Sequence, residues 1–125
     1  MRKDATISET TGVIMEYYMK DYSRENLERL GFRPSSYLSN YEETYYVYRF
    51  TVYRYRYIPT IEADIIVRLE DGEVSIDVFD KNTHGKYAAW YCRNVLGYFG
   101  ENRVVEEIDR LIAKKLKQLG IKEVE

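Results

Sequence analysis

Two segments in which apolar and polar residues alternate flank the dipeptide Asp71-Gly72. Alternation with a period of two is typical of a strand with one buried face, because successive side chains point to opposite sides of a sheet. An Asp-Gly pair between two such strands favours a two-residue type I′ turn. This turn sets an antiparallel register in which Leu69 faces Val74, and it assigns one face of the hairpin to the core. The residues on this predicted core face are Ile65, Val67, Leu69, Val74, Ile76 and Val78.

The segment 45–58 (YYVYRFTVYRYRYI) predicts a further strand, because Tyr, Val, Phe, Thr and Ile are favoured in sheets. Its apolar residues change parity after Val52, and the apolar set beyond that point includes Tyr53, Tyr55 and Tyr57. A β-bulge at 52–53 would return both apolar sets to the same side of the sheet. We therefore expect a bulged strand here, followed by the hairpin.

Helical periodicity lies on both sides of these strands. Ser23 is the predicted N-cap of a short helix, and Gly31 is the predicted residue of positive φ that ends it. In a later helix Ala88 and Cys92 fall on the apolar stripe, so we interpret Cys92 as a core residue. The first seven residues are expected to be frayed. The expected helices are 8–21, 24–30, 86–99 and 101–119, and the expected loops are 33–40 and 80–85.

The order of these elements predicts one α+β domain spanning residues 1–125. Its architecture would be a two-layer sandwich, in which N-terminal helices and two C-terminal helices pack on one face of a three-stranded antiparallel meander. A chain of 125 residues is typical of one domain and long enough to bury a core. The composition, 45% hydrophobic and 32% charged, is that of a globular protein.

The sequence also indicates a compartment. One cysteine cannot form an internal disulfide, and we find neither a signal peptide nor an apolar run long enough to span a membrane. We therefore expect a cytoplasmic protein with no membrane partner. The scarcity of Gln and Cys beside many Glu, Lys and Arg is a thermophile-like composition.

The chain lacks the catalytic or binding residues that define several enzyme classes. One Cys and one His, His84, cannot supply a Cys/His zinc site, and there is no Gly-x-Ser-x-Gly sequence. The Gly85-Lys86 pair lacks the upstream Gly and the following Ser or Thr of a phosphate-binding loop. We interpret His84 as a loop residue, and we expect no cofactor and no enzymatic activity.

Two carboxylates on the outer face of the predicted hairpin keep one enzymatic alternative open. Asp64 and Asp77 fall in diagonal contact on adjacent strands and could bind Mg²⁺. The pattern EADII … IDVFDK resembles the core hairpin of PD-(D/E)xK nucleases, whose preceding helix carries an acid, here Glu16. The lysine of that family's pattern falls on Phe79, and the nearest lysine, Lys81, lies about 7 Å further along the strand. The resemblance implies a Mg²⁺-dependent nuclease as an alternative function, beside the interpretation of these residues as a solvated polar face.

Basic and aromatic residues interleave on the predicted sheet and on the following helix. Tyr and Trp stack on nucleobases, and Arg binds phosphate through two parallel hydrogen bonds. The pattern therefore predicts a non-enzymatic binding module for single-stranded nucleic acid or RNA. The candidate binding residues are Arg49, Arg54, Arg56, Arg68, Lys86, Trp90 and Arg93.

The same residue types leave other partners open. Tyr, Trp and Arg are also enriched in protein interfaces, so a protein partner or a second copy of the chain is an alternative. A homo-oligomer would cover the edges of a three-stranded sheet. A net charge of −2 argues against sequence-blind electrostatic binding, although it is compatible with a local basic face. In a purely structural interpretation, the tyrosines pack and the arginines pair with acids.

Overall fold

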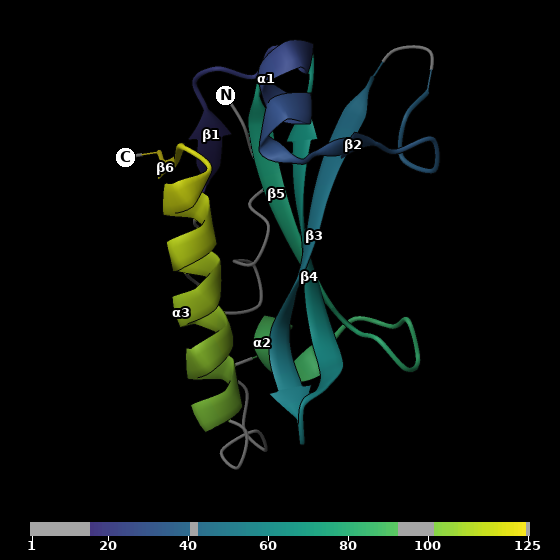
Figure 1. The fold of residues 1–125 in the computed structure, drawn as a ribbon, viewed down its shortest axis with the longest axis vertical. Helices are drawn as coiled ribbons and strands as arrows, with labels where there is room; N and C mark the ends of the chain where they lie inside the picture. The colour runs from purple at the N-terminus through teal and green to yellow at the C-terminus, as the bar shows by residue number, and fades with distance from the viewer. Residues whose placement is uncertain (1–15, 41–42, 93–101, 125) are drawn as a thin grey trace.

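The computed structural model describes residues 16–40, 43–92 and 102–124, which form one antiparallel sheet with helices (Figure 1). The six strands lie in the order β2-β3-β4-β5-β1-β6, and every neighbouring pair is antiparallel. The fold class is therefore α+β, as predicted. The elements are β1 (Tyr17–Met19), α1 (Arg24–Leu30), β2 (Arg33–Pro34), β3 (Tyr45–Tyr55), β4 (Ile58–Arg68), β5 (Glu73–Asp80), α2 (Ala88–Tyr91), α3 (Asn102–Gln118) and β6 (Ile121–Glu123).

The sheet is larger than the predicted three-stranded meander, which forms its centre as β3, β4 and β5. The expected helix at 8–21 is wrong over its described part, because Tyr17–Met19 is strand β1, while residues 8–15 lie outside the described ranges. β1 pairs with both β5 and β6, and its tyrosines are favoured in strands. β2 and β6 are two and three residues long, too short to show a periodicity in the sequence.

The hairpin of β4 and β5 has the predicted faces but a different register. Val67 faces Val74 and Ile65 faces Ile76, so residues 69–72 form a longer connection than the predicted two-residue turn. A carboxylate closes this connection, because Asp71 accepts a hydrogen bond from the backbone N–H of Glu73 at 3.0 Å. A shift of two residues leaves every side chain on its original face. Of the predicted inward residues, all are buried except Leu69, which lies in the connection and is half-buried.

The two-residue turn lies instead between β3 and β4. Tyr55 faces Ile58, so the expected strand at 45–58 ends at Tyr55 and the chain reverses at Arg56 and Tyr57. These two residues have φ angles of 52° and 71°, the positive values that a type I′ turn requires. For bulky L-residues such angles cost about 1–2 kcal/mol each. The bulge predicted at 52–53 is confirmed by register shifts between Thr51 and Arg54.

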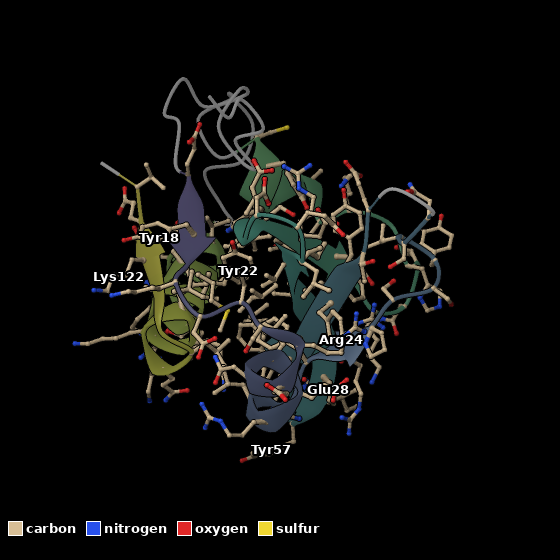
Figure 2. All side chains as sticks on the ribbon, turned by 90° about the horizontal axis from the view of Figure 1, so that it is seen from above. Tyr18, Tyr22, Arg24, Glu28, Tyr57 and Lys122 are labelled. Carbon is tan, nitrogen blue, oxygen red and sulfur yellow. The ribbon has the colours of Figure 1, made fainter. Side chains whose placement is uncertain are left out.

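Helix α1 forms as predicted, with both of its caps. The hydroxyl of Ser23 accepts the N–H of Asn26 at 3.3 Å, and Gly31 ends the helix at a φ of 107°. Its first turns hold strand β3 through the buried Tyr46, whose hydroxyl accepts a hydrogen bond from Arg24 at 2.9 Å. The labelled Arg24 and Glu28 in Figure 2 therefore belong to the contact between α1 and the sheet.

The later helices complete the core, with one correction. The described helix α2 spans four residues, and it buries Ala89 and Trp90 rather than the predicted Ala88 and Cys92, which are exposed and half-buried. The inward face of α2 is thus rotated relative to the predicted stripe and places the large Trp90 ring in the core. The rest of the expected helix, residues 93–99, lies outside the described part of the chain.

Helix α3 carries the predicted apolar stripe, and one cluster of buried side chains joins it to α1, α2 and the inner face of the sheet. The buried residues of α3 are Val105, Ile108, Ile112 and Leu116. The indole nitrogen of Trp90 donates to the Asp109 carboxylate at 2.9 Å, which fixes α2 against α3. Within the described ranges, no helix has the length and apolar character needed to cross a bilayer.

Candidate functional site

The outer face of the sheet carries a row of charges that neutralise one another. Arg49 on β3 donates two hydrogen bonds to Asp64 on β4, from Nε to Oδ1 at 2.7 Å and from Nη2 to Oδ2 at 2.9 Å. Asp64 faces Asp77 on β5 directly. The Asp77 carboxylate lies 3.5 Å from the ammonium of Lys86 and accepts a hydrogen bond from the Tyr91 hydroxyl at 3.3 Å. Two of the predicted binding cations, Arg49 and Lys86, are therefore partnered by acids.

The ionisation of this row follows from its contacts. The hydrogen-bonded carboxylate of Asp64 raises the pKa of Arg49 above its ordinary value. Burial raises the pKa of Tyr91, and the negative charge of Asp77 adds to this effect, against the opposing hydrogen bond from the backbone N–H of Val78. Tyr91 thus stays a neutral donor to Asp77 at and well above neutral pH.

The two aspartates are closer than predicted, since they are directly opposed rather than diagonal. Arg49 occupies both oxygens of Asp64, which is 14% exposed, so the position that a Mg²⁺ ion would take holds a guanidinium. Phe79, at the lysine position of the nuclease pattern, packs under Arg49 with 4.7 Å between the guanidinium carbon and the ring centroid. Among the described residues, no group of three or more His, Cys, Asp or Glu side chains is placed to hold a metal.

Two other residues of the nuclease pattern, Lys81 and Glu16, do not take the positions that the resemblance implies. The Lys81 ammonium lies 3.9 Å from the Glu62 carboxylate and forms an ion pair with it, although Phe79 is the residue directly opposite Glu62. Glu16 precedes strand β1 and does not lie on a described helix. His84 is an exposed loop residue, as predicted, with a φ of 63°.

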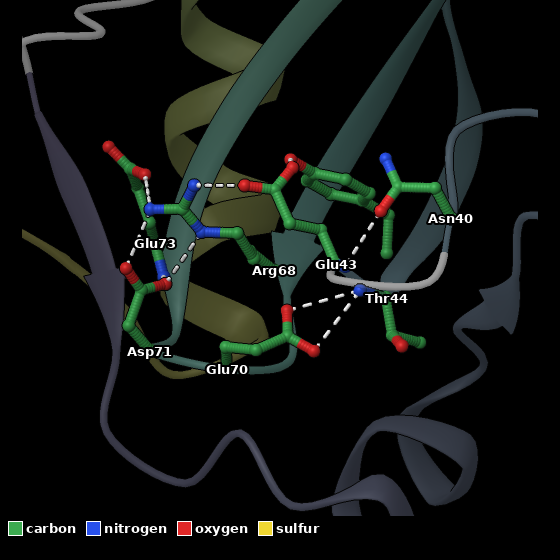
Figure 3. A network of polar contacts seen from close by, with 8 residues as sticks. Asn40, Glu43, Thr44, Arg68, Glu70, Asp71 and Glu73 are labelled. Atoms are coloured by element: carbon green, nitrogen blue, oxygen red, sulfur yellow. Dashed lines mark hydrogen bonds and ion pairs between the residues drawn. The ribbon is translucent and has the colours of Figure 1, made fainter.

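Arg68 is at the centre of a second acidic network, at the end of β4 (Figure 3). Its guanidinium contacts the carboxylates of Asp71 at 2.7 Å, Glu73 at 2.5 Å and Glu43 at 3.3 Å. These acids, with the hydrogen bond to Asp71 as the largest contribution, raise the pKa of Arg68. Glu70 accepts the backbone N–H of Thr44 in the same network. Arg68 therefore ties the loop before β3 to the β4–β5 connection.

Three further cations, Arg54, Lys114 and Lys115, line a groove between β3 and α3. The groove has a volume of about 310 Å³, and none of its described lining residues carries a carboxylate. The ammonium of Lys115 lies 5.3 Å and 5.5 Å from the ring centroids of Tyr48 and Phe50, which hold it over the sheet. The lining residues are Phe50, Thr51, Arg54, Leu111, Lys114, Lys115 and Gln118.

Arg54 also belongs to the tip of the β3–β4 hairpin, residues 54–58, which reaches the bottom of Figure 1. All five tip residues are exposed, with exposed fractions of 56% for Tyr55, 93% for Tyr57 and 65% for Ile58. The guanidinium carbon of Arg56 lies 5.3 Å from the ring centroid of Tyr55. Tyr57 lies at the periphery of the molecule, well apart from Lys122 on β6 (Figure 2).

We call the four cations around this groove and tip, Arg54, Arg56, Lys114 and Lys115, the basic surface. None of them forms an ion pair with an acid within the part of the chain that the structure describes. This separates them from Arg49, Arg68 and Lys86. The surface thus combines unneutralised positive charge with exposed aromatic rings, the pair of features needed to bind phosphates and bases.

The predicted site residues divide accordingly. Arg54 and Arg56 lie on the basic surface, whereas Arg49, Arg68 and Lys86 pair with acids. Trp90 is 1% exposed, so the structure places its side chain in the core rather than on the predicted binding face. Lys86 precedes α2 and bridges to Phe79, and Arg93 lies outside the described residues, so the proposed helix face does not form among the described residues.

Lys114 and Lys115 are not among the binding residues that the sequence predicts. The run of lysines in the second half of α3 could have indicated them as binding residues. The same pattern also complements the helix dipole, which explains the lysines without a binding role. Tyr55 and Tyr57 belong to the apolar set that the sequence predicts to face inward. The turn at Arg56 and Tyr57 places them outside the core.

Comparisons of the chain with protein-family models, with curated proteins and with solved structures found no significant match.

Proposed function

We propose that this protein is a small non-enzymatic module that binds nucleic acid through the basic surface. The observation that carries the proposal is that the cations of the basic surface lie apart from acidic side chains among the described residues. The chain has a net charge of −2, yet Arg54, Lys114 and Lys115 line one groove that has no carboxylate among its described lining residues. Arg56 is exposed on the adjacent hairpin tip. Unneutralised cations at one site attract phosphates, because binding releases the counterions condensed on the nucleic acid.

The division of the arginines supports the same site. Arg49 and Arg68 are held by two or more hydrogen bonds to carboxylates, so phosphate binding would have to break those contacts. Arg54 and Arg56 are exposed and have no such competitor among the described residues. The proposed interface is therefore the hairpin tip and the β3–α3 groove rather than the outer face of the sheet.

The test is a titration of labelled single-stranded and double-stranded oligonucleotides, followed by fluorescence anisotropy at 50 and 200 mM salt. About four phosphate contacts predict a slope of log affinity against log salt of about −3 on single strands, roughly a 50-fold loss over this range. Added Mg²⁺ should leave the labelled strand intact. Absence of binding, or binding that salt does not weaken, would refute the proposal, and cleavage would revive the nuclease alternative through Asp64 and Asp77.

One observation favours a second candidate, a protein partner or a second copy of the chain. Ile58 is 65% exposed beside two exposed tyrosines, and aliphatic side chains contribute more to protein interfaces than to phosphate binding. Light scattering at micromolar concentration tests the second copy. A dimer-sized mass that disappears in Ile58→Ser but is retained in Ile66→Val, the matched change on the buried part of the same strand, would support it.

A further inference from the structure

The turn at the tip of the β3–β4 hairpin is built from residues that its geometry disfavours. Both central positions of a type I′ turn need positive φ, for which Asn and Gly are suited. Here they are Arg56 and Tyr57, at 52° and 71°. The turn therefore carries backbone strain that the sequence Asn-Gly would relieve.

No packing in the described structure compensates for this strain. Tyr57 is 93% exposed and takes no part in the core cluster, and Tyr55 is 56% exposed. Arg56 lies over one face of the Tyr55 ring. The strained turn thus holds two aromatic rings and a guanidinium in solvent, and backbone strain of this kind is concentrated at functional sites.

We infer that Tyr55 and Tyr57 form a stacking platform for unpaired nucleobases, which makes the protein selective for single strands. The inference rests on the proposed function, because it needs phosphates bound on the adjacent basic surface. Arg54 supplies the connection, since it lines the β3–α3 groove and stands at the base of the same tip. A strand whose phosphates lie along the groove would bring its bases to the tip.

The preference for single strands follows from the geometry of the bases. In a duplex both faces of an internal base are stacked on neighbouring pairs, so a protein ring has no free face to cover. In a single strand each base exposes a face, and stacking on an aromatic side chain does not depend on its identity. We therefore expect binding with little sequence preference and a clear discrimination against duplexes.

The test compares two labelled 12-nucleotide strands with equal charge, one of thymidines and one in which the central positions are abasic. Stacking predicts that the wild-type protein binds the thymidine strand roughly tenfold more tightly, about the contribution of one stacked base. Tyr57→Asn removes the ring and suits the positive φ, so it should reduce this preference towards one without lowering the melting temperature. Tyr57→Phe keeps the ring and should keep the preference.

The outcomes separate this inference from the proposed function. Equal affinity of the wild-type protein for both strands, with binding that still falls steeply with salt, would overturn the stacking platform and leave phosphate binding in place. A preference that persists undiminished in Tyr57→Asn would also overturn it, because Tyr57 would then not be one of the two rings of the platform. No binding of either strand would overturn the inference and the proposed function together.

Discussion

Arg49 and Asp64 form a two-point contact across β3 and β4, from Nε to Oδ1 at 2.7 Å and from Nη2 to Oδ2 at 2.9 Å. This geometry uses the same donors that a bound phosphate would need. An arginine can therefore look like a binding residue in the sequence and yet be fully engaged within the fold. The basic residues of the sheet therefore fall into two groups, those that pair with a carboxylate of the fold and those that remain accessible to a ligand.

Arg49→Ala should destabilise the protein by about 1–3 kcal/mol, because it leaves the carboxylate of Asp64, which is 14% exposed, without its two charged donors. Urea denaturation measures the change. Nucleic-acid affinity should stay within about twofold of wild type, since Arg49 lies outside the basic surface. A large loss of affinity without a loss of stability would place the interface on the outer face instead.

The double variant Arg56→Asn/Tyr57→Gly should stabilise the fold. Asn and Gly adopt positive φ with little strain, so the hairpin should gain about 1–2 kcal/mol, or about 3–8 °C in melting temperature. Differential scanning calorimetry checks this. A lower melting temperature than wild type would show that the exposed side chains of the tip contribute more to stability than their exposure suggests.

Trp90 should behave as a core residue in solution. It is 1% exposed and donates to Asp109, so Trp90→Ala should cost about 3–5 kcal/mol. The fluorescence of this one tryptophan should resist quenching by iodide, with and without nucleic acid. Strong quenching in the free protein that nucleic acid suppresses would instead restore Trp90 to the interface.

Tyr91 should make the protein sensitive to alkali. Burial raises its pKa above the ordinary value of about 10, so the folded state holds the phenolic proton more tightly than the unfolded state. This contribution to stability is complete below pH of about 10 and is lost as the pH rises above it. Tyr91→Phe should flatten this part of the stability profile, measured by urea denaturation between about pH 9 and 11. An unchanged slope would show that Tyr91 is not the titrating group.

The faces of the central strands could be read from the sequence, because a period of two survives a shift of the register by two residues. The length of the β4–β5 connection could not be read from the sequence. It depends on the Asp71 carboxylate, which accepts hydrogen bonds from the backbone N–H of Glu73 and from the Arg68 guanidinium. The sequence predicts a helix where β1 lies, because the pairing of β1 with β5 and β6 is a tertiary contact that no local pattern shows. The tyrosines in and near β1 fit the periodicity of a helix as well as that of a strand.

The candidate site was harder to predict than the fold. Arg54 and Lys114 both line one groove, although they lie on elements far apart in the chain. Only the packing of α3 against β3 brings them together. Composition showed many arginines and tyrosines, but which arginines are neutralised depends on the register that sets Arg49 opposite Asp64.

The most direct test of the account reverses the charge of the groove. Lys114→Glu/Lys115→Glu is compared with Lys20→Glu/Lys122→Glu, which makes the same change in net charge outside the basic surface. Both proteins are titrated with the same labelled 12-nucleotide thymidine strand at 50 mM salt, after circular dichroism has shown that each is folded. The account predicts a loss of affinity of roughly 100-fold or more in the groove variant and a loss of less than about fivefold in the control. Equal losses in the two variants would contradict it, because net charge alone, and not the basic surface, would then govern binding.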